Sequence, residues 1–277
     1  MTSDPSDPGE SASRALEIRG STAGLLDDPF LLRVRGAGPD AQPTWRARYR
    51  DDDGRVWRAA ASRPEDLPAR WSPAKDGTGD VAALRSLRPV SIEVRVETAD
   101  GRAAARTLTR TIASGDLRTR RWRDGLTATL HVPSEPSPCA TVIVDAGATA
   151  AQATTATLAA PLLASRGVLA LVVIATRGAA HTAHTLATAR ERLSAVPGAA
   201  DEIVLLSALD PLGEHEPGAL EVVVLPPNVG LRERGDGESA VRAAAWDALL
   251  ARLGARPRYA ISTASPSATV PSSRTSP

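Results

Sequence analysis

Polar and apolar residues alternate along several short stretches of the first half of the chain. From Trp45 to Arg50, aromatic residues and alanine occupy every second position, with arginines between them. Asp51 to Gly54 then supplies residues typical of a turn, and a second short alternating stretch follows. Alternation with period two is typical of a β-strand with one buried face, so this pattern predicts a β-hairpin.

The same pattern recurs twice before residue 133. Val90 to Val96 alternates, and after a turn the chain returns along Thr107 to Ile112. A further turn leads into a third alternating stretch, Leu126 to Val132. Strands at short intervals, with few helical segments between them, predict an antiparallel β-sandwich over residues 15–133.

The pattern changes after a connector rich in proline and serine, residues 133–138. Beyond it, uniformly apolar runs of strand length alternate with alanine-rich and leucine-rich helical segments. Because such runs are typical of parallel strands covered by helices, residues 139–256 are predicted to form a shortened α/β domain with a mostly parallel sheet. Residues 1–14 and 262–277 carry little apolar surface and are predicted to be disordered.

Composition excludes several classes of function. The chain carries 33 basic and 32 acidic residues, a net charge of +1, so no large positive field attracts nucleic acid. The single cysteine, Cys139, and the four histidines lack the spacing of a zinc site, and no cofactor is expected. The longest apolar run, Val168 to Ala175, is much shorter than the roughly 20 residues of a membrane-spanning helix. With no secretory signal pattern at residues 1–14, a cytoplasmic location is expected.

Four segments of the chain occur in an order that resembles one known family. Trp45 to Trp57 and Gly79 to Pro89 lie in the first half, and Ala140 to Gly147 and Leu162 to Leu171 lie in the second. They are similar to segments of the acyl-CoA thioesterases and bile acid-CoA:amino acid N-acyltransferases. In that family an immunoglobulin-like domain precedes an α/β-hydrolase domain. The resemblance implies this fold and the cleavage or transfer of an acyl thioester, with acyl-CoA or another acyl thioester as the partner.

The family's chemistry requires a Ser or Cys nucleophile on a G-x-S-x-G or G-x-C-x-G elbow, aided by His and Asp. Neither motif occurs in this sequence. The stretch Asp201 to Pro211 aligns in two ways: Leu209 takes the place of the nucleophile, or Asp210 is the catalytic acid of a later strand and the elbow is deleted. No His follows the apolar run Leu220 to Leu225, where the family would place the catalytic one.

The remaining catalytic candidates lie at the ends of predicted strands. Ser207 and Asp210 follow one apolar run, and His215 is close enough in sequence to complete a makeshift triad. Gly147 and Ala148 follow the first strand of the second half, where the resemblance implies an oxyanion loop. Cys139 precedes that strand, which is the wrong place for a nucleophile.

Other polar clusters are better explained by solvent exposure. His181 and His184 share one face of a predicted helix but have no carboxylate at matching spacing, and arginines 46, 48 and 50 form the polar side of a strand. The sequence therefore predicts a thioesterase-like protein with weak or lost activity. The alternative is a non-catalytic module that binds acyl-CoA or another protein, including a homo-oligomer formed through an exposed sheet edge.

Overall fold

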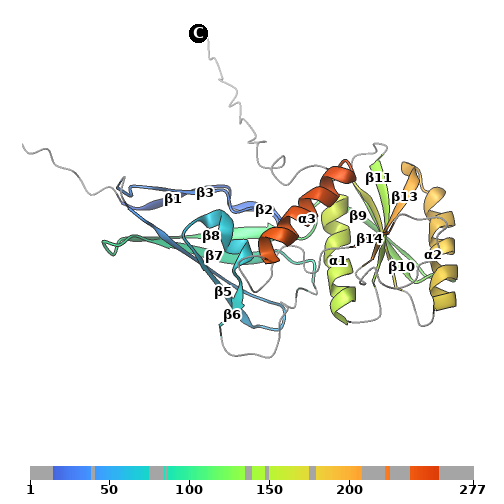
Figure 1. The fold of residues 1–277 in the computed structure, drawn as a ribbon, viewed down its shortest axis with the longest axis horizontal. Coiled ribbons are helices and arrows are strands. Elements are labelled where there is room, and N and C mark those ends of the chain that lie inside the picture. The colour runs from blue at the N-terminus through green and yellow to red at the C-terminus, as the bar shows by residue number, and fades with distance from the viewer. Residues whose placement is uncertain are drawn as a thin grey trace, which may run out of the picture.

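The computed structural model describes residues 15–38, 41–74, 84, 86–134, 139–146, 150–174, 179–207, 222–224 and 238–255. Their strands form two six-stranded sheets and one two-stranded sheet. The two larger sheets follow one another along the long axis of the molecule, and the α-helices gather around the second (Figure 1). The predicted disordered ends, residues 1–14 and 262–277, lie outside the described residues.

The first six-stranded sheet is mixed. Its strand order is β2 (Ala23–Leu25), β8 (Ala103–Thr111), β7 (Val90–Glu97), β4 (Thr44–Arg50), β5 (Val56–Ala61) and β6 (Ser72–Pro73). Neighbouring strands are antiparallel except β2 and β8, which are parallel. Pairing of β4 with β5 and of β7 with β8 confirms the first two predicted hairpins. The two-stranded sheet joins β1 (Glu17–Gly20) to β3 (Leu32–Arg35), and a 3-10 helix, η1 (Pro64–Ala69), lies against β3, β4 and β5.

Asp51 fixes the turn of the first hairpin. Its carboxylate accepts hydrogen bonds from the backbone N–H groups of Asp53 and Arg55, at 3.1 and 2.8 Å. It also accepts one from the indole Nε1 of Trp57, at 3.0 Å. Gly54 adopts a φ of 80°, a conformation that costs glycine little. The acidic turn thus anchors the buried indole of the next strand.

The second six-stranded sheet begins with parallel strands and ends with antiparallel ones. Its order is β14 (Val222–Val224), β13 (Ala199–Ser207), β11 (Cys139–Asp145), β12 (Leu169–Val173), β10 (Ala128–Val132) and β9 (Arg118–Trp122). The first four strands are parallel to one another, whereas β10 runs antiparallel to both β12 and β9.

The prediction of an antiparallel sandwich followed by a mostly parallel sheet of the α/β-hydrolase type is wrong. Strand accounts for 42% of the structure and helix for 23%, and the sheets are mixed or antiparallel. Residues 126–132, predicted to belong to the β-sandwich, include β10, which pairs with β12 in the second sheet. Alternation of apolar and polar residues indicates that a strand has one buried face, but it does not indicate which sheet the strand joins.

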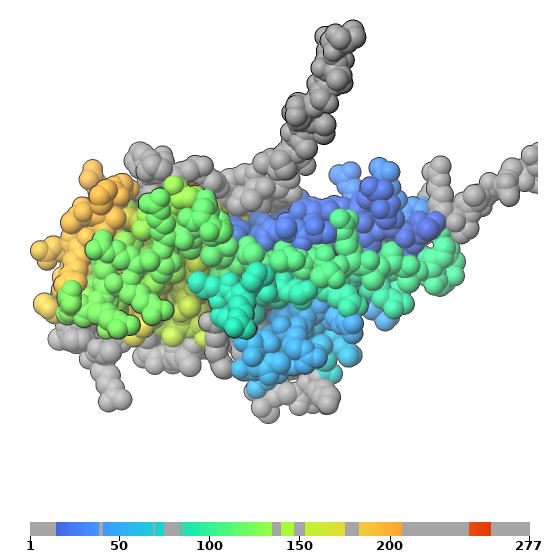
Figure 2. Space-filling view, turned by 180° about the vertical axis from the view of Figure 1, so that it is seen from behind, coloured from blue at the N-terminus to red at the C-terminus, as the bar shows by residue number. Residues whose placement is uncertain are grey.

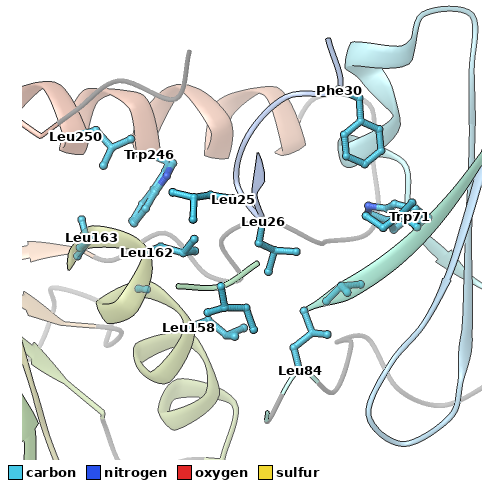
Figure 3. Packing of buried hydrophobic residues seen from close by; sticks show 14 of the residues in the cluster. Leu25, Leu26, Phe30, Trp71, Leu84, Leu158, Leu162, Leu163, Trp246 and Leu250 are labelled. Carbon is cyan, nitrogen blue, oxygen red and sulfur yellow. The ribbon is translucent and has the colours of Figure 1, made fainter. Parts of the chain in front are cut away.

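Two apolar cores bury the faces of the second sheet. Helices α1 (Ala150–Ser165) and α3 (Glu238–Arg252) lie on the side that faces the first sheet, and α2 (Ala179–Ser194) lies on the far side (Figure 1). One cluster of buried side chains runs from the first sheet to α1 and α3, while a smaller one includes residues of α2. Figure 3 shows Leu25 and Leu26 beside Leu162 and Trp246. The first sheet and the helical layer therefore share one core.

Candidate functional site

The parallel strands of the second sheet end along one line, which we call the carboxyl edge. Asp145 ends β11 and is in register with Val173 of β12 on one side and with Ser207 of β13 on the other. From β11 the chain reaches β12 through α1, and from β12 it returns through α2 to β13, on the opposite side of β11. Ligands of sheets with parallel strands bind at the carboxyl ends, at the point where the strand order reverses. That point lies between β11 and β13.

Asp145 is a buried carboxylic acid at this point, with 6% of its surface exposed. A single Asp at the end of an apolar run looks like an ordinary strand end, so the sequence pattern predicted no role for Asp145. Only the register across β11 and β13 shows that it lies beside Ser207.

Of the predicted catalytic residues, only Ser207 falls in the described part of the chain. It is the last residue of β13 and is in register with Val224 of β14 as well as with Asp145. Asp210, Gly147 and Ala148 lie outside the described residues, as do Leu209 and His215. The predicted pairing of Ser207 with Asp210, and the oxyanion role of Gly147 and Ala148, stay predictions.

Cys139 begins β11 and is therefore at the opposite edge of the sheet from Asp145. Six residue-to-residue steps of extended strand separate the two, which is roughly 20 Å at about 3.3 Å per step. Its register partner is Ala199, the first residue of β13. The geometry agrees with the expectation that Cys139 stands in the wrong place for a nucleophile at the carboxyl edge.

None of the described histidines lies on a strand that pairs with β13, the strand that ends at Ser207. His131 lies in β10, two strands away from β11, and is in register with Ala170 near the start of β12. Burial lowers the pKa of its imidazole to about 4, so the ring is neutral near pH 7. His184 is an exposed residue of α2, as expected from the sequence. A serine hydroxyl is a weak nucleophile until a nearby imidazole takes its proton.

The predicted polar face of β4 forms ion pairs with the neighbouring strand. Arg48 Nη2 lies 2.7 Å from Glu93 Oε2, and Arg46 Nη1 lies 3.8 Å from Glu97 Oε2. These side chains are largely exposed, so each pair contributes little to stability, about 0–1 kcal/mol. The arginines of β4 are thus part of a solvated sheet face.

A buried cluster of charges, which we call the junction network, lies where the first sheet meets α1 and α3. Arg166, directly after α1, donates from Nε to Asp27 Oδ2 at 2.9 Å and from Nη2 to Asp27 Oδ1 at 2.7 Å. The same Nη2 donates to Asp28 Oδ1 at 2.9 Å. Trp246 of α3 donates from Nε1 to Asp27 Oδ2 at 2.8 Å. The side chains of Arg166 and Asp27 are 0% and 1% exposed.

Arg110 of β8 is the second buried cation of the junction network. Its guanidinium carbon lies 5.1 Å from the centre of the Phe30 ring. Burial lowers the pKa of Arg110, while the charges of Asp28 and Asp27 oppose that shift. Burial also raises the pKa of Asp28, against the hydrogen bond from Arg166. Two carboxylates and two guanidinium groups thus compensate one another inside the molecule.

No sequence pattern predicted the junction network. Asp27-Asp28-Pro29 has the composition of a turn, and Arg166-Gly167 that of a helix end. Nothing local to either segment shows that they meet, since 139 residues separate Arg166 from Asp27.

The described part of the chain holds no group of three His, Cys, Asp or Glu residues that would bind a metal ion. Among its helices, none has the length and apolarity required to cross a membrane. No protein-family model matches the sequence, and no curated protein matches it. The resemblance to acyl-CoA thioesterases therefore rests on the sequence segments alone.

Proposed function

We propose that this protein is related to the acyl-CoA thioesterases, binds an acyl thioester at the carboxyl edge of β11 and β13, and hydrolyses it weakly or not at all. The observation that carries the proposal is the register of Ser207 with Asp145 at the point where the strand order reverses. Ligand sites in sheets with parallel strands are found at such points. The cytoplasmic location expected from the single cysteine belongs to the same proposal.

The sequence after Ser207 supports the loss of hydrolysis. A nucleophile elbow needs glycines on both sides of the nucleophile so that the chain can turn sharply and present backbone N–H groups to the oxyanion. Here the chain continues Ser-Ala-Leu-Asp-Pro over residues 207–211, with no glycine. In the alignment that puts Leu209 at the nucleophile position, its side chain has no atom that can attack a thioester; in the other alignment the elbow is deleted.

Ile174 supports the binding of an apolar ligand. It directly follows β12 at the carboxyl edge, and half of its surface, 50%, is exposed. Its backbone N–H donates to Thr127 O at 3.2 Å, which ties it to the residue directly before β10. An acyl chain that covers Ile174 removes apolar surface from water, at about 25 cal/mol per Å².

The first experiment measures both release and binding of the ligand. We expect no release of CoA from a panel of short to long acyl-CoAs, by the wild type or by Ser207→Ala. We expect saturable binding of a palmitoyl thioether analogue of CoA in calorimetry, weakened about tenfold by Ile174→Glu. Leu87→Glu is the matched control, since Leu87 is 48% exposed and lies outside the second sheet.

Turnover that Ser207→Ala abolishes would contradict the loss of chemistry. Absence of thioether binding, or equal weakening by Ile174→Glu and Leu87→Glu, would contradict an acyl site at the carboxyl edge.

A second candidate function is a non-catalytic module that pairs with another protein or with its own copy. The observation that favours it is the edge position of β14 and β9, which end the second sheet in the described part of the chain. Exposed edge strands present unpaired backbone groups to other chains. The oligomeric state in solution tests the homo-oligomer.

A further inference from the structure

Strand β9 concentrates positive charge at one edge of the second sheet. Residues 118–123 read Arg-Thr-Arg-Arg-Trp-Arg, and all four arginines are exposed. Among the described residues, none of these four forms an ion pair, whereas Arg46, Arg48 and Arg95 of the first sheet all do. β9 and the residue after it thus place four exposed arginines within six positions of a chain whose net charge is only +1.

The outer side of β9 is a free strand edge in the described part of the chain. β9 pairs antiparallel with β10 over five residues, and no described strand lies on its other side. β9 belongs to the green surface that faces the viewer in Figure 2. Each strand edge carries a row of N–H and C=O groups, so the outer row of β9 is able to pair with one more extended segment.

The arginines lie on both faces of the sheet. Arg118 and Arg120 are in register with Val132 and Leu130 of β10, while Arg121 is in register with Thr129. Successive side chains of a strand point to opposite faces, so Arg120 and Arg121 are on different faces. A strand added at β9 therefore meets a guanidinium group on either face, and opposite charges on neighbouring strands stabilise the pair.

The positive charge of β9 also determines which kind of segment is able to pair with its outer edge. A second copy of β9 would place arginine opposite arginine, which is destabilising on neighbouring strands. An acidic strand reverses the sign of each of these interactions. We propose that β9 binds an extended, acidic segment of a partner protein by strand addition, with its backbone on the outer edge of β9 and its carboxylates on the arginines at 118, 120, 121 and 123.

Fluorescence anisotropy with a labelled peptide that repeats Thr-Glu-Glu-Thr, and so carries carboxylates on both faces of an extended strand, tests the proposal. We expect saturable binding to the full chain, weakened about tenfold or more by the double variant Arg120→Glu/Arg121→Glu. The matched control is Arg33→Glu/Arg58→Glu, which makes the same change of charge at exposed positions of β3 and β5. Circular dichroism checks that both variants fold.

Two further probes separate strand addition from attraction of any anion. A peptide with proline in place of threonine keeps the charge but lacks half of the N–H donors, and we expect it not to bind. Single-stranded DNA of the same charge should bind at least about tenfold more weakly than the threonine peptide. Equal binding of the proline peptide or of DNA overturns strand addition, and an equal loss in both double variants overturns the assignment to β9.

Discussion

His131 is a buried imidazole that the fold keeps neutral. It is 5% exposed, and within the described residues its Nδ1 has no hydrogen-bond partner. Burial lowers its pKa from 6.5 to about 4, because the surrounding side chains solvate the protonated ring poorly. Its neighbours in register are Ala170 and Thr119, neither of which carries a charge. A proton on His131 therefore opposes folding.

We expect acid to destabilise the protein through His131. Between about pH 6.5 and about pH 4, His131 binds a proton in the unfolded chain but not in the folded chain. Above about pH 6.5, His131 therefore does not lower the free energy of unfolding. As the pH drops from 6.5 toward 4, the free energy of unfolding falls by about 1.4 kcal/mol per pH unit and by about 3 kcal/mol in total. Urea unfolding of the wild type, His131→Phe and His184→Gln across this range measures the effect.

His131→Phe should flatten the pH dependence, and His184→Gln, a change at an exposed histidine, should leave it as in the wild type. If all three proteins lose the same stability between pH 6.5 and 4, other groups carry the acid sensitivity.

At the scale of helices and strands, the sequence predicts a feature when the residues that cause it lie within one short segment. The hairpin of β4 and β5 is encoded within Trp45 to Trp57, since Asp51 and Gly54 make the turn and the alternation makes the strands. The apolar runs of β11, β12 and β13 also reported burial on both faces, and they placed Ser207 at a strand end. The partner strand of β10 and the position of Asp145 beside Ser207 depend on pairing between distant segments, which no local pattern contains.

The edge strand β14 is the element through which a homo-oligomer would form. Its three residues, Val222–Val224, are apolar, whereas the other edge of the same sheet, β9, is basic and repels its own copy. We expect light scattering to give twice the monomer mass, and Val223→Lys to restore the monomer. Ala105→Lys, at an exposed alanine of β8, is the control and should remain a dimer. A wild-type monomer at high concentration contradicts pairing through β14.

At the scale of the whole molecule, the junction network joins the two large sheets into one unit. Asp27 lies in the turn after β2 of the first sheet, and its partners are Arg166, directly after α1, and Trp246 of α3. The apolar cluster around it includes residues of both parts. Breaking a buried ion pair by removing one partner costs about 3–5 kcal/mol, because a charge is left without compensation.

We expect Arg166→Met to lower the free energy of unfolding by about 3–5 kcal/mol and to split one calorimetric transition into two. Arg48→Met is the control, since it removes an exposed ion pair with Glu93 that is worth about 1 kcal/mol or less. Restoring the charge balance in Arg166→Met/Asp27→Leu should recover part of the loss. If Arg166→Met and Arg48→Met lose the same free energy of unfolding and each keeps a single calorimetric transition, the junction network does not couple the sheets.

The junction network also has a consequence for biosynthesis. A ribosome makes the chain from its amino terminus, and Trp246 is added 219 residues after Asp27. At roughly 5–20 residues per second, about 10–40 s pass between the synthesis of Asp27 and the synthesis of Trp246. Until Trp246 has been made, Asp27 therefore lacks one of the hydrogen bonds that it has inside the complete fold.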